Sequence, residues 1–281
     1  MYYIGVDLGT SAVKLLLMES DGTIANIVSE DYPISFPHPG WSEQNPEDWW
    51  KAVQKGIREL LKDHDSSKVA GISFGGQMHG LVVLDKKDNV IRPAILWNDG
   101  RTQKETDYLN TVIGKDKLSD YCANIAFAGF TAPKILWMKA NEPENFARID
   151  KIMLADDYVA YKLSGVHCTD VSDASGMLLF DVRNKKWSHE MCEICGISEN
   201  MLAEIFESYD TVGCIKSDVA ESLGLRPDVR IAAGAGDNAA AAVGTGTVGD
   251  GMCNISLGTS GTIFISSHDF RVDKFNSIHA F

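Results

Sequence analysis

Short apolar runs separated by turn residues fill the first thirty positions, which is the pattern of successive strands. Two such runs, residues 4–8 and 13–17, are separated by a short turn. The pair Asp21-Gly22 then predicts a tight hairpin into a third strand over residues 24–28. We therefore expect the chain to begin with three consecutive antiparallel strands.

A change to helical spacing follows a loop rich in Pro, His and Gly. Asn45 is a good N-cap, Pro46 suits the first helical position, and acidic residues fill the first turn. Apolar side chains then recur every three or four residues up to about Asp63. They are Trp49, Val53, Ile57, Leu60 and Leu61. This pattern predicts an amphipathic helix.

The rest of the chain alternates between strand and helix signals. Residues 68–74 form a buried strand that Gly75-Gly76 is expected to end, and residues 81–84 form another strand. From about Thr102 to Leu202 the pattern is mostly helical. A last strand covers 230–233, a tight turn covers 234–237, and an alanine-rich helix starts at Asn238. This order predicts an α/β unit built on a mixed sheet.

One four-residue turn occurs twice. Leu8-Gly9-Thr10-Ser11 and Leu257-Gly258-Thr259-Ser260 both lie between strand-like runs, which indicates two related domains. Backbone N–H groups and hydroxyls in such turns suit phosphate oxygens. Asp7 precedes the first turn, where a carboxylate beside a phosphate site suits Mg²⁺, whereas Ser256 precedes the second. Two ordinary hairpins that share small residues remain the alternative.

Composition and charge narrow the function classes. The 281 residues are enough for one large domain or two ordinary ones, and the net charge of −13 argues against nucleic acid or an anionic membrane as a partner. No apolar run reaches the length of a membrane span, and the first residues do not resemble a signal peptide. The six cysteines are scattered, so we expect reduced thiols and a cytoplasmic location. Cys192 and Cys195 lack further metal ligands nearby and are interpreted as structural.

Five segments together resemble the FGGY family of sugar kinases. They are Asp7–Ser11, Ser73–Gly80, Trp97–Thr102, Gly234–Asn238 and Leu257–Gly261, in that order. The resemblance spans the chain from Tyr3 onward and implies the ribonuclease-H-like, actin-like ATPase fold, an α/β domain with a mixed sheet and flanking helices. It also implies that residues 1–245 are the N-terminal sugar-binding and catalytic domain. Residues 246–281 would then be the first strands of a C-terminal nucleotide-binding domain, whose adenine pocket this chain lacks.

The resemblance assigns roles to the acidic residues and the two turns. It makes Asp237 the general base, at a helix N-terminus that favours its ionised form, and Asp7 the catalytic Mg²⁺ ligand. The alternative is that Asp237 only caps the helix. The implied ATP phosphate contacts are Gly9, Thr10, Ser11, Gly258, Thr259 and Ser260.

The sugar contacts are implied by the same resemblance. They are Gln77, Met78, His79, Trp97, Asp99 and Asn238. Gln77-Met78-His79-Gly80 points to D-xylulose rather than glycerol. Each residue also has a plainer interpretation: a single His is often structural, Trp97 suits a core, and Asp99 can simply pair with Arg101.

The implied activity is phosphorylation of D-xylulose to D-xylulose 5-phosphate by MgATP, as part of a two-domain enzyme. The alternatives are a kinase for ribulose, fuculose, gluconate or glycerol, a non-catalytic sugar-binding fragment, and an actin-like or chaperone-like ATPase. Sugar and ATP are the expected partners, without nucleic acid or membrane, and a homodimer remains open.

Overall fold

A mixed sheet is the centre of the protein. The computed structural model describes residues 1–257, 261–273 and 278–281. Within these residues the sheet has seven strands in the order β13-β14-β5-β1-β2-β3, with β15 also pairing with β5. The strands are β1 (Tyr2–Leu8), β2 (Ala12–Glu19), β3 (Ile24–Asp31), β5 (Val69–Gly76), β13 (Thr211–Cys214), β14 (Arg230–Ala232) and β15 (Ala235–Gly236).

The direction of the strands confirms the predicted start of the chain. β1, β2 and β3 are successive antiparallel neighbours. β5 then pairs with β1 in parallel, and β14 and β15 pair with β5 in parallel. Parallel pairing needs a crossover, and α1 (Pro46–Leu60) lies in the crossover from β3 to β5.

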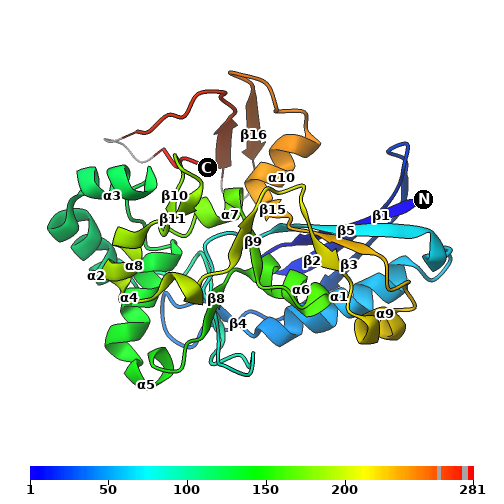
Figure 1. The fold of residues 1–281 in the computed structure, drawn as a ribbon, viewed down its shortest axis with the longest axis horizontal. Helices are drawn as coiled ribbons and strands as arrows, with labels where there is room; N and C mark the ends of the chain where they lie inside the picture. The colour runs from blue at the N-terminus through cyan, green and yellow to red at the C-terminus, as the bar shows by residue number, and fades with distance from the viewer. Residues whose placement is uncertain (258–260, 274–277) are drawn as a thin grey trace.

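One face of this sheet is covered and the other is open. Ile4, Val6 and Leu8 of β1 are buried in a core shared with α1, α6 (Ala155–Ser164) and α9 (Ser217–Leu223). These helices lie together along one side of the sheet in Figure 1. Because side chains alternate along a strand, Gly5 and Asp7 point to the opposite face. The start of α10 (Asp237–Gly244) lies over that face.

The predicted start of α1 is confirmed. The Asn45 side chain accepts a hydrogen bond from the backbone N–H of Glu47 at 3.1 Å, and Pro46 is the first helical residue. The helix ends at Leu60, three residues before the predicted end. Its buried face packs against β2 and β3, so the amphipathic pattern fixes how the first crossover lies on the sheet.

A second hydrophobic core lies in a mainly helical lobe beside the sheet (Figure 1). The helical segments not yet named are η1 (Ser66–Lys68), α2 (Gln103–Tyr108), η2 (Leu109–Gly114), α3 (Lys115–Cys122), α4 (Thr131–Asn141), α5 (Pro143–Phe146), α7 (Val171–Ser175), α8 (His189–Cys195) and η3 (Glu199–Met201). Cys192 and Cys195 of α8 are free and buried in this core, in keeping with a structural role.

Short strands interrupt the segment that the sequence pattern makes mostly helical. The short strands outside the central sheet are β4 (Glu43–Gln44), β6 (Val82–Leu84), β7 (Ala94–Ile95), β8 (Lys151–Met153), β9 (Cys168–Asp170), β10 (Phe180–Asp181), β11 (Lys186–Trp187) and β12 (Glu204–Phe206). β8 pairs with β6 and β9 with β12, both distant in the chain. Runs of two or three residues carry no readable period, so the helical prediction was too broad here.

The prediction that Gly75-Gly76 ends a strand was also wrong. β5 continues through both glycines because β15 pairs with them, Ala235 opposite Gly75 and Gly236 opposite Gly76. Because Gly75 and Gly76 have no side chains, Ala240 and Asp156 can pack closely against this part of β5. A Cβ at Gly75 would lie 3.3 Å from the Ala240 Cβ, and one at Gly76 would lie 2.5 Å from Asp156.

The C-terminal part forms a separate hairpin of β16 (Cys253–Leu257) and β17 (Gly261–Ile265), which stands above α10 in Figure 1. The second Gly-Thr-Ser turn, Gly258, Thr259 and Ser260, lies outside the described residues. Within the described ranges, no helix is both long enough and apolar enough to cross a bilayer.

Candidate active site

A cleft of about 800 Å³ lies over the open face of the sheet. Its walls come from β1, β2, β5, the start of α10 and the β16–β17 hairpin. The polar residues that line it are Asp7, Lys14, Ser73, Asp237, Asn238, Asn254, Ser256 and Thr262. The cleft therefore brings together two of the residues singled out from opposite ends of the sequence, Asp7 and Asp237.

Asp7 lies near the C-terminal end of β1, with Lys14 of β2 directly opposite in the antiparallel register. Burial raises the pKa of Asp7, and the Lys14 ammonium partly opposes that shift. Lys14 was not among the residues chosen from the sequence, because a lysine on a hairpin is usually solvated. The register places it in the cleft beside Asp7.

Asp237 enters the cleft from a sharp turn. Gly234 has φ of +89°, which favours glycine, and Gly236 is the N-cap of α10, so Asp237 is the first helical residue. Burial raises the pKa of Asp237 most, and the charge of Asp7 raises it further, against a hydrogen bond from the Asn238 backbone. The expected preference for the ionised form at the helix end is therefore outweighed.

The first Gly-Thr-Ser turn is held by Tyr32 and Gln44, which sequence reasoning missed, and by Trp97, which it assigned to the sugar. Tyr32 donates its hydroxyl to the Gly9 carbonyl, and Gln44 donates to the Thr10 carbonyl at 2.7 Å. Trp97 donates its indole N–H to the Thr10 hydroxyl at 2.9 Å. Each of these side chains lies 23 to 87 positions from its partner in the turn, so no local sequence pattern predicts the contacts.

Ser11 completes this turn through its backbone, since its carbonyl accepts from the Tyr32 N–H at 3.2 Å. Gly9 also lines the cleft, while Thr10 and Ser11 form the rest of the turn beside it. The turn is thus fixed by contacts from the residue after β3, from β4 and from the segment after β7.

His79 is half-buried, and its ring orientation is fixed by its contacts. Its φ of +70° is unusual for a residue with a side chain, and its ring stacks on Phe130 with the centroids 4.7 Å apart. Nδ1 donates to the Gly176 carbonyl at 2.9 Å, which leaves Nε2 as a hydrogen-bond acceptor. Burial, and then His279, lower the pKa of His79 to about 3, so the ring is neutral.

The backbone of His79 is fixed from α4. The fully buried Lys134 donates to the His79 carbonyl at 2.9 Å, and Thr131 donates to the same oxygen at 3.2 Å. Burial lowers the pKa of Lys134 to about 7. Two donors on one carbonyl stabilise the left-handed backbone that His79 adopts.

Met78 and Gln77 lie behind the two acids rather than along the cleft. Met78 packs against Gly236, and its sulfur lies 4.0 Å from the Asn238 amide nitrogen. That amide also donates to the Asp237 carboxylate at 3.0 Å. Gln77 donates to the Gly9 carbonyl at 3.3 Å and to Gln44 at 3.1 Å. Both residues therefore link the first turn to the Asp237 turn.

Asp99 and Arg101 pair with each other, as the plainer interpretation proposed. The Arg101 guanidinium contacts the Asp99 carboxylate at 2.7 Å and lies 3.7 Å from the Trp41 ring centre. Asp99 also accepts from the Ser42 N–H at 2.6 Å. Asp99 is buried in this network and does not line the cleft, whereas Trp97 is partly exposed.

Solved structures with the same architecture define the fold as that of the actin-like ATPases. A crystal structure of a xylulose kinase from Brucella ovis superposes with a TM-score of 0.94 at 39% identity, covering 98% of this chain and 56% of that one. A gluconate kinase from Lactobacillus acidophilus superposes with a TM-score of 0.90 at 27% identity, over 93% of this chain and 53% of its own.

The family follows from the sequence comparison. Residues 2–244 match the N-terminal domain of the FGGY family of carbohydrate kinases, and the chain belongs to that family. It is 39% identical over 279 residues to the xylulose kinase of Escherichia coli (strain K12), covering 99% of this chain and 57% of that protein. The chain thus corresponds to the N-terminal portion and spans a little over half the length of this relative.

Proposed function

We propose that this chain supplies the sugar-binding and catalytic part of a kinase that transfers the γ-phosphoryl group of ATP to a hydroxyl of D-xylulose. The observation that carries the proposal is the meeting of Asp7 and Asp237 in one cleft. The product would be D-xylulose 5-phosphate.

Asp237 acts as the general base in this proposal. Its raised pKa makes it a better proton acceptor than an ordinary exposed aspartate. Because the transition state of phosphoryl transfer is loose, catalysis depends mainly on positioning the reacting groups and neutralising their charge. Asn238 orients the carboxylate by donating to it at 3.0 Å.

Asp7 suits Mg²⁺. Its carboxylate lies in the cleft close to the Gly9 turn, and one carboxylate beside phosphate oxygens is a common magnesium arrangement. Bound there, Mg²⁺ would neutralise charge on the transferred phosphoryl group. Backbone N–H groups and hydroxyls of Gly9, Thr10 and Ser11 would approach the phosphates from the same side.

The sugar is proposed to lie against the loop after β5. His79 offers Nε2 as an acceptor for a sugar hydroxyl, because Nδ1 is committed to Gly176. Gln77, Met78 and Asn238 lie next to this loop and to Asp237. Trp97, which donates to the Thr10 hydroxyl, is the aromatic side chain that we propose for the sugar, while Asp99 contributes through the network that holds that segment.

The ATP-binding site would be completed by residues beyond the described cleft. We propose that residues 1–245 form the sugar-binding domain and that 246–281 open a nucleotide-binding domain, in which Gly258, Thr259 and Ser260 would bind the phosphates. Asn254, Ser256 and Thr262 of the hairpin line the cleft on the side facing Asp7. Closure of two such domains would exclude water from the transfer.

The test uses a two-domain protein that carries this chain. Asp237→Asn should lower kcat for xylulose by about 10²- to 10⁴-fold, the usual contribution of a general base, with the fold unchanged by circular dichroism. Asp228→Asn, an exposed aspartate paired with Arg226, is the control and should leave kcat unchanged.

A substrate panel tests the choice of sugar. The panel should include xylulose, ribulose, fuculose, gluconate and glycerol, each with MgATP. Turnover with gluconate but not xylulose would move the assignment toward the activity named for the Lactobacillus relative. Wild-type turnover in Asp237→Asn would remove the base assignment itself.

A further inference from the structure

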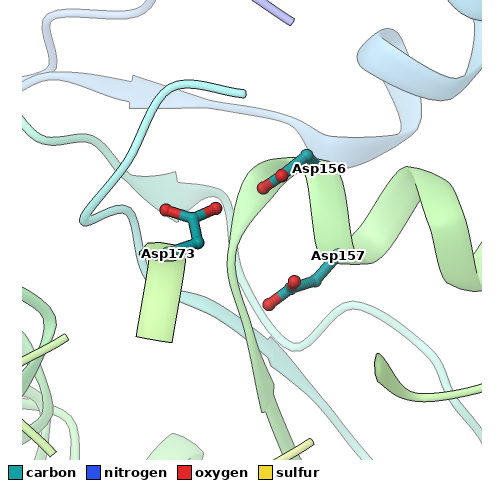
Figure 2. A group of neighbouring side chains, drawn as sticks. All are labelled: Asp156, Asp157 and Asp173. Atoms are coloured by element: carbon teal, nitrogen blue, oxygen red, sulfur yellow. The ribbon is translucent and has the colours of Figure 1, made fainter. Parts of the chain in front are cut away.

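Three buried carboxylates lie together behind the candidate active site. Asp156 and Asp157 belong to the first turn of α6, and Asp173 belongs to α7. One oxygen from each lies within 4.8 Å of the others. Figure 2 shows the three carboxylates converging on the space between the two helices.

Asp173 is the informative member of this group. It is 0% exposed, it is aimed at the two aspartates of α6, and neither of its carboxylate oxygens accepts a hydrogen bond from an N–H or O–H donor of the described residues. The Asp156 carboxyl lies near enough to share a proton with it. Asp156 Oδ1 is also buried without a partner. Asp157 is different, since its Oδ2 accepts from the Leu154 N–H at 2.9 Å.

The described residues place no positively charged side chain in an ion pair with these three carboxylates. Among the residues that the structure describes, no lysine, arginine or histidine forms an ion pair with any of the three. A buried carboxylate must be paired, protonated or bound to a metal, because leaving it ionised in an apolar surrounding costs many kcal/mol. Three together, with unused oxygens facing one another, fit a cation site.

We propose that Asp156, Asp157 and Asp173 bind one divalent cation of about the size of Ca²⁺. Two oxygens on one Ca²⁺ are at most about 5 Å apart, twice the usual metal–oxygen distance, and the oxygens of this group satisfy that limit as they stand. Mg²⁺ fits less well, because it needs ligands within roughly 4.2 Å of one another and keeps several waters. The buried site leaves little room for those waters.

The proposed site is connected to the turn that carries Asp237. Ser172, next to Asp173 on α7, donates its hydroxyl to Asp170 at 2.7 Å and accepts from the Gly236 N–H at 3.1 Å. A cation that holds α7 against α6 would therefore also hold the Gly236 turn. The role is structural, and it does not depend on which reaction the cleft performs.

The experiment uses this chain after treatment with EDTA. Calorimetric titration with CaCl₂ should show one equivalent bound, and CaCl₂ at about 100 times its Kd should raise Tm by roughly 5 °C or more. Asp173→Asn and, as a second variant, Asp156→Asn should lose that binding. Asp7→Asn, which leaves this group intact, should keep it.

Measuring Tm as a function of pH distinguishes two ways of neutralising the three carboxylates, a bound cation and shared protons. Burial raises the pKa of Asp156 to about 6 and also raises the pKa of Asp157 and Asp173, while Asp170 and Cys168 on β9 add further acidic groups. A raised folded-state pKa means stability that is present at low pH and lost as pH rises through that value. The metal-free chain should therefore lose Tm as pH rises from about 4 through about 6, and bound Ca²⁺ should restore an increasing part of that Tm as pH rises.

Two results would overturn the proposal. One is the absence of any Ca²⁺ effect from pH 5 to 8, which would leave shared protons as the means of neutralising the group. The other is an equal Ca²⁺ effect in wild type and in Asp173→Asn, which would place the cation elsewhere.

Discussion

At the scale of single residues, the absence of a side chain at Gly236 matters for the site as much as the carboxylates of Asp7 and Asp237. Gly236 precedes Asp237, and a Cβ there would lie 2.8 Å from the Met78 sulfur. Its φ of −54° is open to any residue, so substitution acts through the collision and not through backbone strain. We expect Gly236→Ala to displace Met78, to lower the free energy of unfolding by about 1–3 kcal/mol and to raise KM for the sugar.

Gly244→Ala is the matched control for that substitution. Gly244 ends the same helix, α10, and a Cβ there meets nothing within 4 Å. Its unfolding free energy should equal that of the parent or exceed it by up to about 1 kcal/mol, because alanine restricts the unfolded chain. Thermal unfolding measures both variants, and equal Tm values for them would contradict the role given to Gly236.

At the scale of elements, α1 depends on its N-cap residue, Asn45. The Asn45 side chain satisfies the Glu47 N–H at 3.1 Å, a donor that has no partner within the helix. We expect Asn45→Ala to cost about 1 kcal/mol, or roughly 2–4 °C in Tm. Lys51→Ala changes an exposed residue of the same helix whose ion pair with Asp48 is solvated, and it should shift Tm by less than about 1 °C. A larger loss for Lys51→Ala than for Asn45→Ala would contradict this account.

The elements also show which parts of the molecule the sequence predicts. The start of α1 and the β1–β2–β3 meander depend on local signals, a cap and alternating strands, and both were predicted. β5 passes through Gly75 and Gly76 because β1 pairs with them on one side and β15 on the other, and both partners are distant in the sequence, so the sequence pattern indicated a break there. Asp7 and Asp237 stood out through their glycine-rich turns. Asp173 did not, because its neighbours in space come from another helix.

At the scale of the whole molecule, the β16–β17 hairpin has two contrasting faces. Asn254, Ser256 and Thr262 belong to the face that lines the cleft. The cross-strand register puts Ile255 opposite Ile263 and Cys253 opposite Ile265, so these side chains share the other face. That face is apolar and exposed, Leu257 to 84%, and contiguous exposed apolar surface usually marks a contact with another part or another protein.

The exposed face of the hairpin should govern how this chain behaves by itself. We expect the chain to bind the dye ANS and to self-associate at micromolar concentration, because water cannot solvate that surface favourably. Ile255→Thr combined with Ile263→Thr keeps the β-branched shape of an exposed cross-strand pair while removing much of its apolar area. This double variant should reduce ANS fluorescence several-fold and shift sedimentation toward the monomer. Thr262→Ser, on the cleft face, should leave both readings unchanged. Equal ANS binding by the double variant and the parent would mean that the apolar surface responsible lies elsewhere on the molecule.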